Sequence, residues 1–363
     1  MITRRANWKV LAAVALLCGC AGDDGDGTES SETLDSGVAT GATGGADDSG
    51  GTPSEGGDDD GSSAATDGSA GEDTGESDGA GDSGSTDGDD TGDTTGGGLG
   101  EPGPDFREAG PFATETSTAS ASLPSGCSMN YDRYTPVDAD APPTVILAHG
   151  FQGSRATMAV WAEHLAGWGL EVIAPDLCHA TIFDADHAAN GGDLVALAAQ
   201  LGVATPAYAG YSAGGLAAVL AAAQDGTTRA LLGLDMVDSG GLGMSAAPAI
   251  VAPAFDLIGD PSMCNESNNG HAVFNATADP RVLAVVAADH CDFQSPADAL
   301  CGGLCGGGGA GAIDDATIAS TVVGMSTAFL LWRSGLDDTG AQWLAPSGHW
   351  YGVLSDAGFV AEP

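Results

Sequence analysis

Basic residues are scarce in this sequence. Its 363 residues include 9 lysine and arginine residues against 51 aspartate and glutamate residues, which gives a formal net charge of −42 at pH 7. Proteins bind nucleic acids and anionic lipid surfaces largely through clusters of basic side chains. The shortage therefore argues against nucleic acid and against a direct anionic-lipid surface as partners.

Residues 21–105 lack basic residues altogether. This segment holds 24 aspartate and glutamate residues, and glycine, serine and threonine supply most of the rest. Such a chain cannot bury enough apolar surface to offset the conformational entropy lost on folding, and its like charges repel one another. We predict a disordered acidic tether over residues 21–105.

The first 20 residues have a different character. They read MITRRANWKVLAAVALLCGC, with three basic residues ahead of a short apolar run. This pattern is typical of a secretory signal peptide, and the run is too short to span a bilayer. Its end, LCGC, resembles the bacterial lipobox, so we predict a lipoprotein signal peptide over 1–20 and a lipid anchor on Cys20. An ordinary signal peptide cleaved nearby is the alternative. The predicted location is the bacterial cell envelope, with that lipid as the only membrane contact.

Residues 106–363 remain for a folded domain. Continuous apolar runs alternate there with longer stretches of helical periodicity. This alternation predicts an α/β fold with a mostly parallel sheet and helices on both faces. The predicted strands are 144–150, 170–176, 207–210, 229–238, 253–260 and 281–289. The predicted helices are 155–169, 191–202, 213–224 and 315–335.

Ser212 lies in PAYAGYSAGG, between two glycines, after a predicted strand and before a predicted helix. That context is typical of a nucleophile elbow, for which Gly210 and Gly214 leave room and Gly215 permits close packing. A serine hydroxyl needs a histidine as base and a third group that orients the histidine. We predict a nucleophilic Ser212; the alternative is a small residue in an ordinary tight turn.

Seven histidines compete for the role of base. His290 follows the predicted strand 281–289, and ligand sites of parallel sheets lie at the carboxyl ends of strands. It also lies downstream of Ser212, as the order serine, acid, histidine requires. His349, in PSGHWYG, is the main alternative. We expect His149, which follows the first long strand, to brace its loop.

Three aspartates at strand ends are candidates for the acid: Asp235 and Asp238 in ALLGLDMVD, and Asp260 in PAFDLIGD. The pattern alone leans slightly to Asp260, although an aspartate after a strand is often a turn or capping residue.

For the oxyanion that forms when a serine attacks a carbonyl group, we predict two backbone N–H donors. One is that of Ala213, after the nucleophile, and the other is that of Phe151 in HGFQGS.

Two further features limit the chemistry. Only 239–252 separates two predicted strands where hydrolases often insert a lid, so we predict no large lid and an open cleft suited to bulky, extended or surface-borne esters.

Six cysteines follow Cys20, and an even number in an exported domain predicts disulfides. Zinc binding by Cys301 and Cys305 is the alternative, but CGGLCGGGG offers no third or fourth ligand. We predict neither a metal nor an organic cofactor.

The motifs HGFQGS, GYSAGG, LDMVD and ADHCDF together resemble α/β-hydrolases. The likeness is to the lidless group that includes plant chlorophyllases, platelet-activating factor acetylhydrolase and bacterial polyester-degrading cutinases, and it covers roughly residues 110–335. It implies an α/β-hydrolase domain over 106–363. It also implies Ser212 as nucleophile, His290 as base and Asp235 as acid, because ALLGLDMVD resembles the chlorophyllase stretch that supplies the acid. Cutinase-type enzymes take the acid from the later strand, which keeps Asp260 as the alternative.

The same resemblance bears on the cysteines. In cutinases the cysteine after the histidine is disulfide-bonded, which implies a bond from Cys291 to Cys264 or to one of Cys301 and Cys305. The chain departs from chlorophyllases at Ala213, where they usually carry a charged residue. The resemblance thus implies the reaction class and leaves the ester open.

These observations predict a secreted, lipid-anchored serine esterase or lipase that cleaves carboxylic esters through an acyl-enzyme. The expected substrate is an ester that is bulky, lipidic or polymeric. The alternative is a catalytically silent surface binding module on a hydrolase scaffold, because the tether and the anchor speak only to location.

Overall fold

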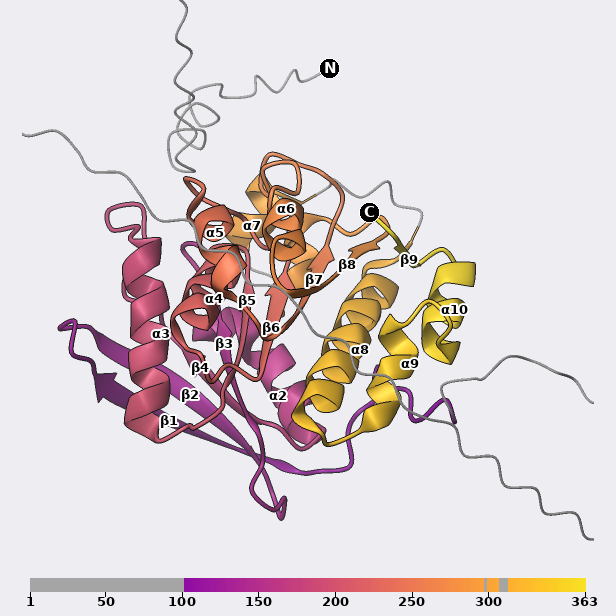
Figure 1. Ribbon diagram of the computed structural model, residues 1–363, viewed down its shortest axis with the longest axis horizontal. Coiled ribbons are helices and arrows are strands. Elements are labelled where there is room, and N and C mark those ends of the chain that lie inside the picture. The colour runs from indigo at the N-terminus through magenta and orange to yellow at the C-terminus, as the bar shows by residue number, and fades with distance from the viewer. Residues whose placement is uncertain (1–100, 297–298, 307–312) are drawn as a thin grey trace, which may run out of the picture. The chain divides into compact units, whose positions relative to one another are not determined.

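A nine-stranded sheet runs through the part of the chain that the computed structural model describes, residues 101–296, 299–306 and 313–363. The strand order is β1-β2-β4-β3-β5-β6-β7-β8-β9 (Figure 1). The strands are β1 (Thr114–Ser122), β2 (Ser128–Pro136), β3 (Thr144–Ala148), β4 (Glu171–Pro175), β5 (Ala207–Tyr211), β6 (Ala230–Leu234), β7 (Pro253–Ile258), β8 (Asp279–Val285) and β9 (Val360–Ala361). The predicted signal peptide, Cys20 and nearly all of the predicted tether lie outside the described residues.

The five pairs from β4 to β8 are parallel, whereas β1–β2, β2–β4 and β8–β9 are antiparallel. The prediction of an α/β fold with a mostly parallel sheet is therefore confirmed. Every residue of β5 and β6 is buried, as expected of strands covered on both faces. Side chains alternate between the two cores, so that Val145 and Leu147 face one and Ile146 and Ala148 the other.

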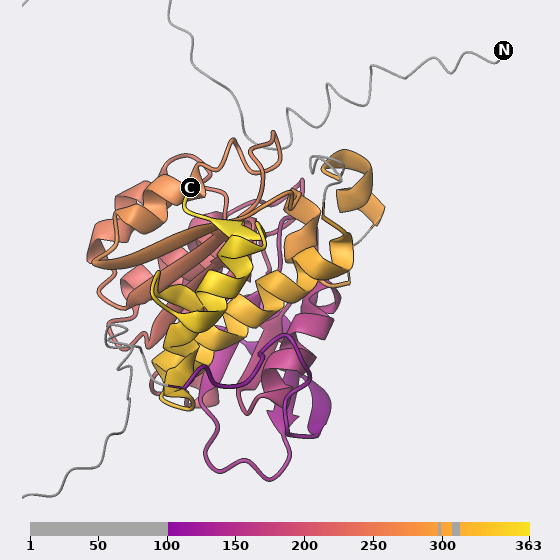
Figure 2. The same cartoon turned by 90° about the vertical axis from the view of Figure 1, so that its right-hand side faces the viewer.

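Helices cover both faces of the sheet (Figures 1 and 2). One core includes residues of α3 (His187–Leu201), α4 (Ala213–Gln224) and α6 (Gly270–Asn275). The other includes residues of α2 (Ala159–Gly167), α8 (Asp315–Ser334), α9 (Ala341–Leu344) and α10 (His349–Asp356). Helix α8 is long and apolar enough to cross a membrane, but most of it is buried, so its composition is that of a core helix.

Several short elements complete the described chain. They are α5 (Leu242–Ala246), α7 (Ala299–Leu304) and the 3-10 turns η1 (Arg155–Met158), η2 (Ala247–Ala249), η3 (His290–Phe293) and η4 (Asp338–Gly340). The segment 239–252, in which no lid was predicted, forms only α5 and η2.

Two predicted strands end four residues earlier than expected, and both differences occur at the edge that carries the site. Strand β6 ends at Leu234 because Asp235 has a φ of 48°, which turns the chain out of the sheet. Strand β8 ends at Val285, and Ala287 has a φ of 63°. The apolar run alone could not show these turns.

The antiparallel strands β1, β2 and β9 were not predicted. Eight of the nine residues of β1 are exposed or partly exposed, so it carries almost no apolar signal. Its pairing with β2 depends on the inner residues of β2, such as Met129 and Tyr131, which are buried.

Candidate active site

Ser212, Asp235 and His290 lie at the carboxyl edge of the sheet. Ser212 follows β5 directly, Asp235 follows β6, and His290 begins η3 beyond the end of β8. Strands β5 and β6 are neighbours, and β8 lies two strands beyond β6. The sheet order therefore gathers residues that are 78 and 55 positions apart in the chain.

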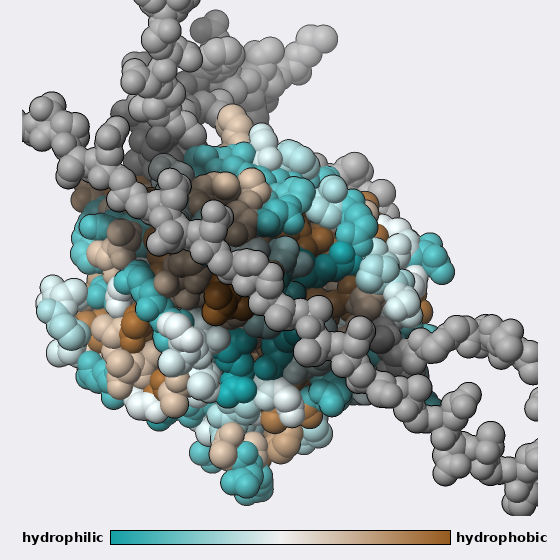
Figure 3. Space-filling model, viewed as in Figure 1, coloured by the Kyte–Doolittle hydropathy of each residue, from teal (hydrophilic) through white to brown (hydrophobic). Residues whose placement is uncertain are grey.

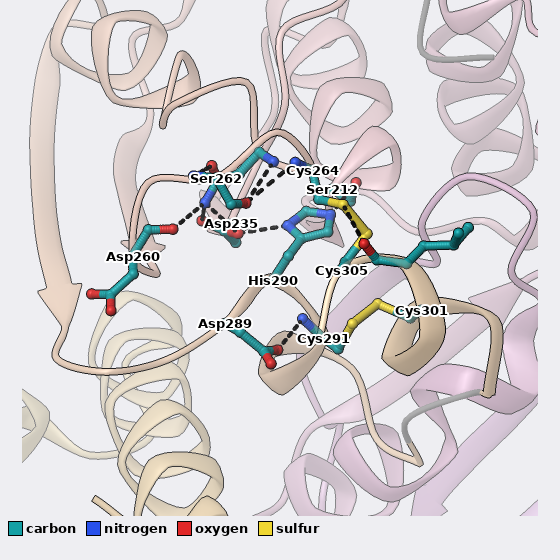
Figure 4. Close-up of a disulfide and its surroundings, with 12 residues drawn as sticks. Ser212, Asp235, Asp260, Ser262, Cys264, Asp289, His290, Cys291, Cys301 and Cys305 are labelled. Carbon is teal, nitrogen blue, oxygen red and sulfur yellow. Dashed lines mark hydrogen bonds and ion pairs between the residues drawn. A yellow bond between two sulfur atoms is a disulfide. The ribbon is translucent and has the colours of Figure 1, made fainter. Parts of the chain in front are cut away.

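The three side chains form one continuous chain of hydrogen bonds (Figure 4). The Nδ1 of His290 lies 2.6 Å from Asp235 Oδ2, and its Nε2 lies 2.9 Å from Ser212 Oγ. An ionised carboxylate only accepts, so Nδ1 carries the proton and Nε2 is free to accept the serine O–H. Ser212, His290 and Asp235 are 8%, 4% and 1% exposed, so little water competes for these bonds.

The turn that carries Ser212 is strained and needs its glycines. Ser212 has φ 53° and ψ −123°, outside the regions that L-residues normally populate. A Cβ on Gly210 would lie 2.2 Å from the Gly214 oxygen, and one on Gly214 would lie 2.3 Å from the His149 oxygen. The β5–α4 turn can therefore form only with glycine at both positions, and it projects the serine hydroxyl from the sheet edge.

Asp235 is held from three sides. Its Oδ1 accepts the Gly259 N–H at 2.9 Å, and the Asn265 side-chain amide donates to Oδ2 at 3.2 Å and to Oδ1 at 3.4 Å. With His290 on Oδ2 as well, this buried carboxylate is well satisfied. Its orientation toward the imidazole is set by these donors.

Asp260 takes a different place. Its backbone oxygen accepts the Asn265 amide at 2.9 Å, and its carboxylate points away from His290 (Figure 4). Asp238 accepts the backbone N–H groups of Gly243 and Met244 and so caps the start of α5. Of the three candidate acids, only Asp235 contacts the imidazole.

The other histidines serve elsewhere. The prediction that His149 braces its loop is confirmed: its Nδ1–H donates to the Gly150 oxygen at 2.8 Å, and its Nε2 accepts the Leu177 N–H at 3.0 Å. Burial lowers the pKa of His149, which favours this neutral state. His349 is exposed at the start of α10, with its ring edge-on to Trp350.

The loop 149–154 lies against the serine. A Cβ on Gly150 would lie 2.7 Å from the Tyr211 ring and 3.3 Å from the Ser212 Cβ. Within the described residues, no backbone acceptor pairs with the Phe151 N–H or the Ala213 N–H. Ala213 is the first residue of α4, where a helix supplies no acceptor of its own. Both predicted donors thus belong to segments in contact with Ser212.

Three disulfides confirm the interpretation of the cysteines. The pairs are Cys127–Cys178, Cys264–Cys305 and Cys291–Cys301. Of the partners that the resemblance implied for Cys291, the structure has Cys301. Both cysteines of the zinc alternative are thus held in disulfides.

Two of the disulfides fasten α7 beside the site (Figure 4). The bond from Cys291 to Cys301 was one of the predicted alternatives, whereas the pairing of Cys264 with Cys305 was not predicted. Cys301 binds the residue after His290, and Cys305 binds the residue before Asn265. The Tyr211 hydroxyl lies 3.4 Å from Cys301 Sγ, and its ring lies 4.9 Å from that of His290. Cys301 and Cys305 are four positions apart, which places them on one side of a helical turn. This spacing was the feature of the sequence that could have indicated that both fasten the same segment.

Asn265 was also missed as a site residue. It lies in CNESNNG, in a loop with no helical or strand period, and nothing local indicates that its amide reaches Asp235.

The comparisons with known proteins do not extend this description. No protein-family model matches the chain, and a search of the curated proteins finds no match.

Proposed function

We propose that this chain is a serine hydrolase of the α/β-hydrolase fold that cleaves carboxylic esters. The observation that carries the proposal is the continuous hydrogen-bond chain from Ser212 through His290 to Asp235. It is supported by the strained turn between β5 and α4 and by the chain order serine, acid, histidine, both of which belong to this fold.

In the proposed first half-reaction, the Ser212 Oγ attacks the ester carbonyl carbon while His290 Nε2 takes the hydroxyl proton. Asp235 keeps the imidazole oriented and stabilises its positive charge. The negative charge that develops on the carbonyl oxygen is stabilised by the N–H groups of Phe151 and Ala213. His290 then gives its proton to the departing alcohol, which leaves an acyl group on Ser212.

The second half-reaction regenerates the enzyme. His290 removes a proton from water, and the hydroxide formed attacks the acyl carbon. The same two N–H groups stabilise the second oxyanion. The acid departs, His290 returns the proton to Ser212 Oγ, and neither a metal nor an organic cofactor takes part.

The proposal includes export and anchoring through a lipid on Cys20, with residues 21–105 as a tether. This part rests on the sequence of the first 105 residues. The test is fractionation of cells that express the full chain or Cys20→Ala. Lipidation is supported if only the unaltered chain enters the detergent phase, and it is wrong if both partition alike.

The catalytic proposal is tested with p-nitrophenyl esters of several chain lengths. We expect hydrolysis by the unaltered protein, a loss of about 10³-fold or more in kcat for Ser212→Ala, and full activity for the matched exposed-serine control Ser245→Ala. Labelling by a fluorophosphonate should occur on Ser212 alone. Hydrolysis that survives Ser212→Ala contradicts the assignment, and a protein that neither labels nor hydrolyses favours the silent binding module.

A further inference from the structure

Exposed apolar side chains gather at the edge of the sheet that carries Ser212. Among the described residues, ten large apolar side chains are exposed, and six of them lie in the loops or in the short helices α5 and α7 that follow the carboxyl ends of β4, β6, β7 and β8. They are Ile182 and Phe183 after β4, Leu242 and Met244 in α5, Met263 after β7, and Leu304 in α7. In Figure 3, brown side chains collect in the region of α5. We call these six side chains the apolar rim.

Phe183 is held out in solvent by a rigid turn. It is 93% exposed, so it contributes nothing to the core. Around it, Thr181 and Asp184 exchange both backbone hydrogen bonds, at 2.9 and 3.0 Å. His179 Nδ1 lies 2.9 Å from the Asp184 carboxylate, and the adjoining Cys178 is disulfide-bonded. A turn fixed at so many points holds the backbone of Phe183 in one place.

The same turn is joined to the proposed oxyanion loop. The Gln152 N–H donates to the Ala180 oxygen at 2.7 Å. Gln152 is the residue after Phe151, and Ala180 is the residue before the 181–184 turn. His149 accepts the Leu177 N–H nearby. Phe183 therefore keeps a fixed relation to the proposed oxyanion donor.

The opposite side of the rim is fixed by a disulfide. Met263 is 77% exposed and precedes Cys264. Leu304 precedes Cys305, which forms a disulfide with Cys264. Strands β4 and β7 each lie two strands from β5, on opposite sides. At the usual spacing of neighbouring strands, β4 and β7 lie about 10 Å to either side of the Ser212 strand, so the loops that carry Phe183 and Met263 begin on opposite sides of Ser212.

Charge decides what kind of apolar surface this rim can meet. The described residues contain six arginines and no lysine, and five of the arginines are paired with carboxylates. Arg229 bonds to Thr205 instead. The rim itself is flanked by the carboxylates of Asp184 and Glu266. An anionic lipid surface would be repelled there, whereas an uncharged apolar surface would not.

We propose that the apolar rim docks this protein onto the surface of an uncharged, water-insoluble ester phase and so brings ester groups to Ser212. The inference rests on the proposed function for the hydrolysis step and adds the physical state and charge of the substrate. Rigid anchoring favours such docking, because the backbone that carries these side chains is already ordered and loses little conformational entropy at the surface.

The test compares a tributyrin emulsion with soluble p-nitrophenyl acetate, using the full chain with Cys20→Ala in every variant so that the proposed lipid anchor does not contribute to binding. The measured quantity is the ratio of the rate on the emulsion to the rate on the soluble ester. Phe183→Ser should lower this ratio about tenfold, because burial of one phenyl ring is worth at least that factor in partitioning. Because Phe183 makes no core contact, this variant should fold. Met263→Ser should lower the ratio as well.

The matched control is Val251→Ser. Val251 is 74% exposed and precedes β7, so it lies at the amino ends of the strands, away from the rim. This control should leave both rates unchanged. An unchanged ratio in Phe183→Ser, or an equal loss in the control, would overturn the proposal.

Binding without turnover separates the two proposals. Ser212→Ala should adsorb to tributyrin droplets, Ser212→Ala with Phe183→Ser should adsorb about tenfold less, and neither should bind phosphatidylglycerol vesicles. Equal adsorption to the anionic vesicles would overturn the inference alone. Soluble-ester hydrolysis that persists in Ser212→Ala would instead overturn the proposed function.

Discussion

Asn265 holds the carboxylate of Asp235 through its side-chain amide, with Nδ2 3.2 Å from Oδ2 and 3.4 Å from Oδ1. The same amide donates to the backbone oxygen of Asp260 at 2.9 Å. Both aspartates therefore belong to one network, but only one presents its carboxylate to His290. This difference between side chain and backbone is the basis of the first two predictions.

Asp235→Asn should lower kcat for a soluble ester by about 10⁴, because an amide favours the wrong imidazole tautomer. Asp260→Asn should change kcat by less than about threefold, since its carboxylate does not face the imidazole and its backbone oxygen is retained. Steady-state kinetics of the two variants compares them directly. A larger loss in Asp260→Asn would reverse the assignment of the acid.

Asn265→Ala should lower kcat by roughly 10- to 100-fold with little change in KM. The buried carboxylate of Asp235 loses a donor, and a small displacement of the imidazole costs rate more than binding. The neighbouring exchange Asn268→Ala, which removes a bond to the Gly259 oxygen, serves for comparison. If Asn265→Ala raised KM and left kcat unchanged, Asn265 would be a substrate-binding residue instead.

Gly150→Ala should lower kcat by about 10²- to 10³-fold, the usual cost of one lost oxyanion donor. The new Cβ would meet the Tyr211 ring at 2.7 Å and so push the loop 149–154 away from Ser212. Gly226→Ala is the control, because a Cβ there meets nothing within 4 Å. Equal kinetics of the two variants would show that the position of this loop does not matter for the rate.

The Cys291–Cys301 disulfide should matter for rate as well as for stability. Closing a loop of 10 residues is worth about 3 kcal/mol in the chain-entropy account. The double variant Cys291→Ser/Cys301→Ser should therefore unfold at lower urea concentration and also have a lower kcat, since Cys291 adjoins His290. Removing Cys127–Cys178 should destabilise the fold with a smaller effect on kcat for a soluble ester. Equal kinetic losses would mean that the effect is one of global stability.

Asp256 should make the protein less stable as the pH rises. This carboxyl is fully buried in β7 beside Gly233, where a Cβ would lie 2.2 Å from its Oδ1. Burial, and to a smaller extent the charge of Asp235, raises the pKa of Asp256 well above its usual value. The unfolded chain loses this proton near pH 4 and the folded chain at higher pH. Stability is therefore lost between those two values.

Asp256→Asn should remove this loss and raise the free energy of unfolding at pH 8 by at least about 1 kcal/mol, since one unit of pKa shift corresponds to about 1.4 kcal/mol. Urea unfolding at pH 5 and pH 8 measures the free energy of unfolding of both proteins, and Asp356→Asn, at an exposed aspartate, is the control. A variant that keeps the pH dependence of the unaltered protein would contradict the prediction.

The fold class and the position of the serine could be predicted from local pattern. Apolar runs such as 144–150 and 253–260 are long enough to indicate strands buried on both faces, and the glycines around Ser212 indicate the turn. Strand β1 could not be predicted in this way, because its outer face is exposed and its place in the sheet depends on pairing with β2.

The sequence by itself determined which residue types stand at strand ends, because strand, turn and helix patterns depend on neighbours in the chain. Only the tertiary structure decided that Asp235 faces His290, that Asn265 holds it, and that Cys301 pairs with Cys291. Those relations join residues from separate strands and loops, and their distances follow from sheet order and from left-handed turns such as that at Asp235. Local periodicity in the sequence contains neither the order of the strands nor the positions of these turns.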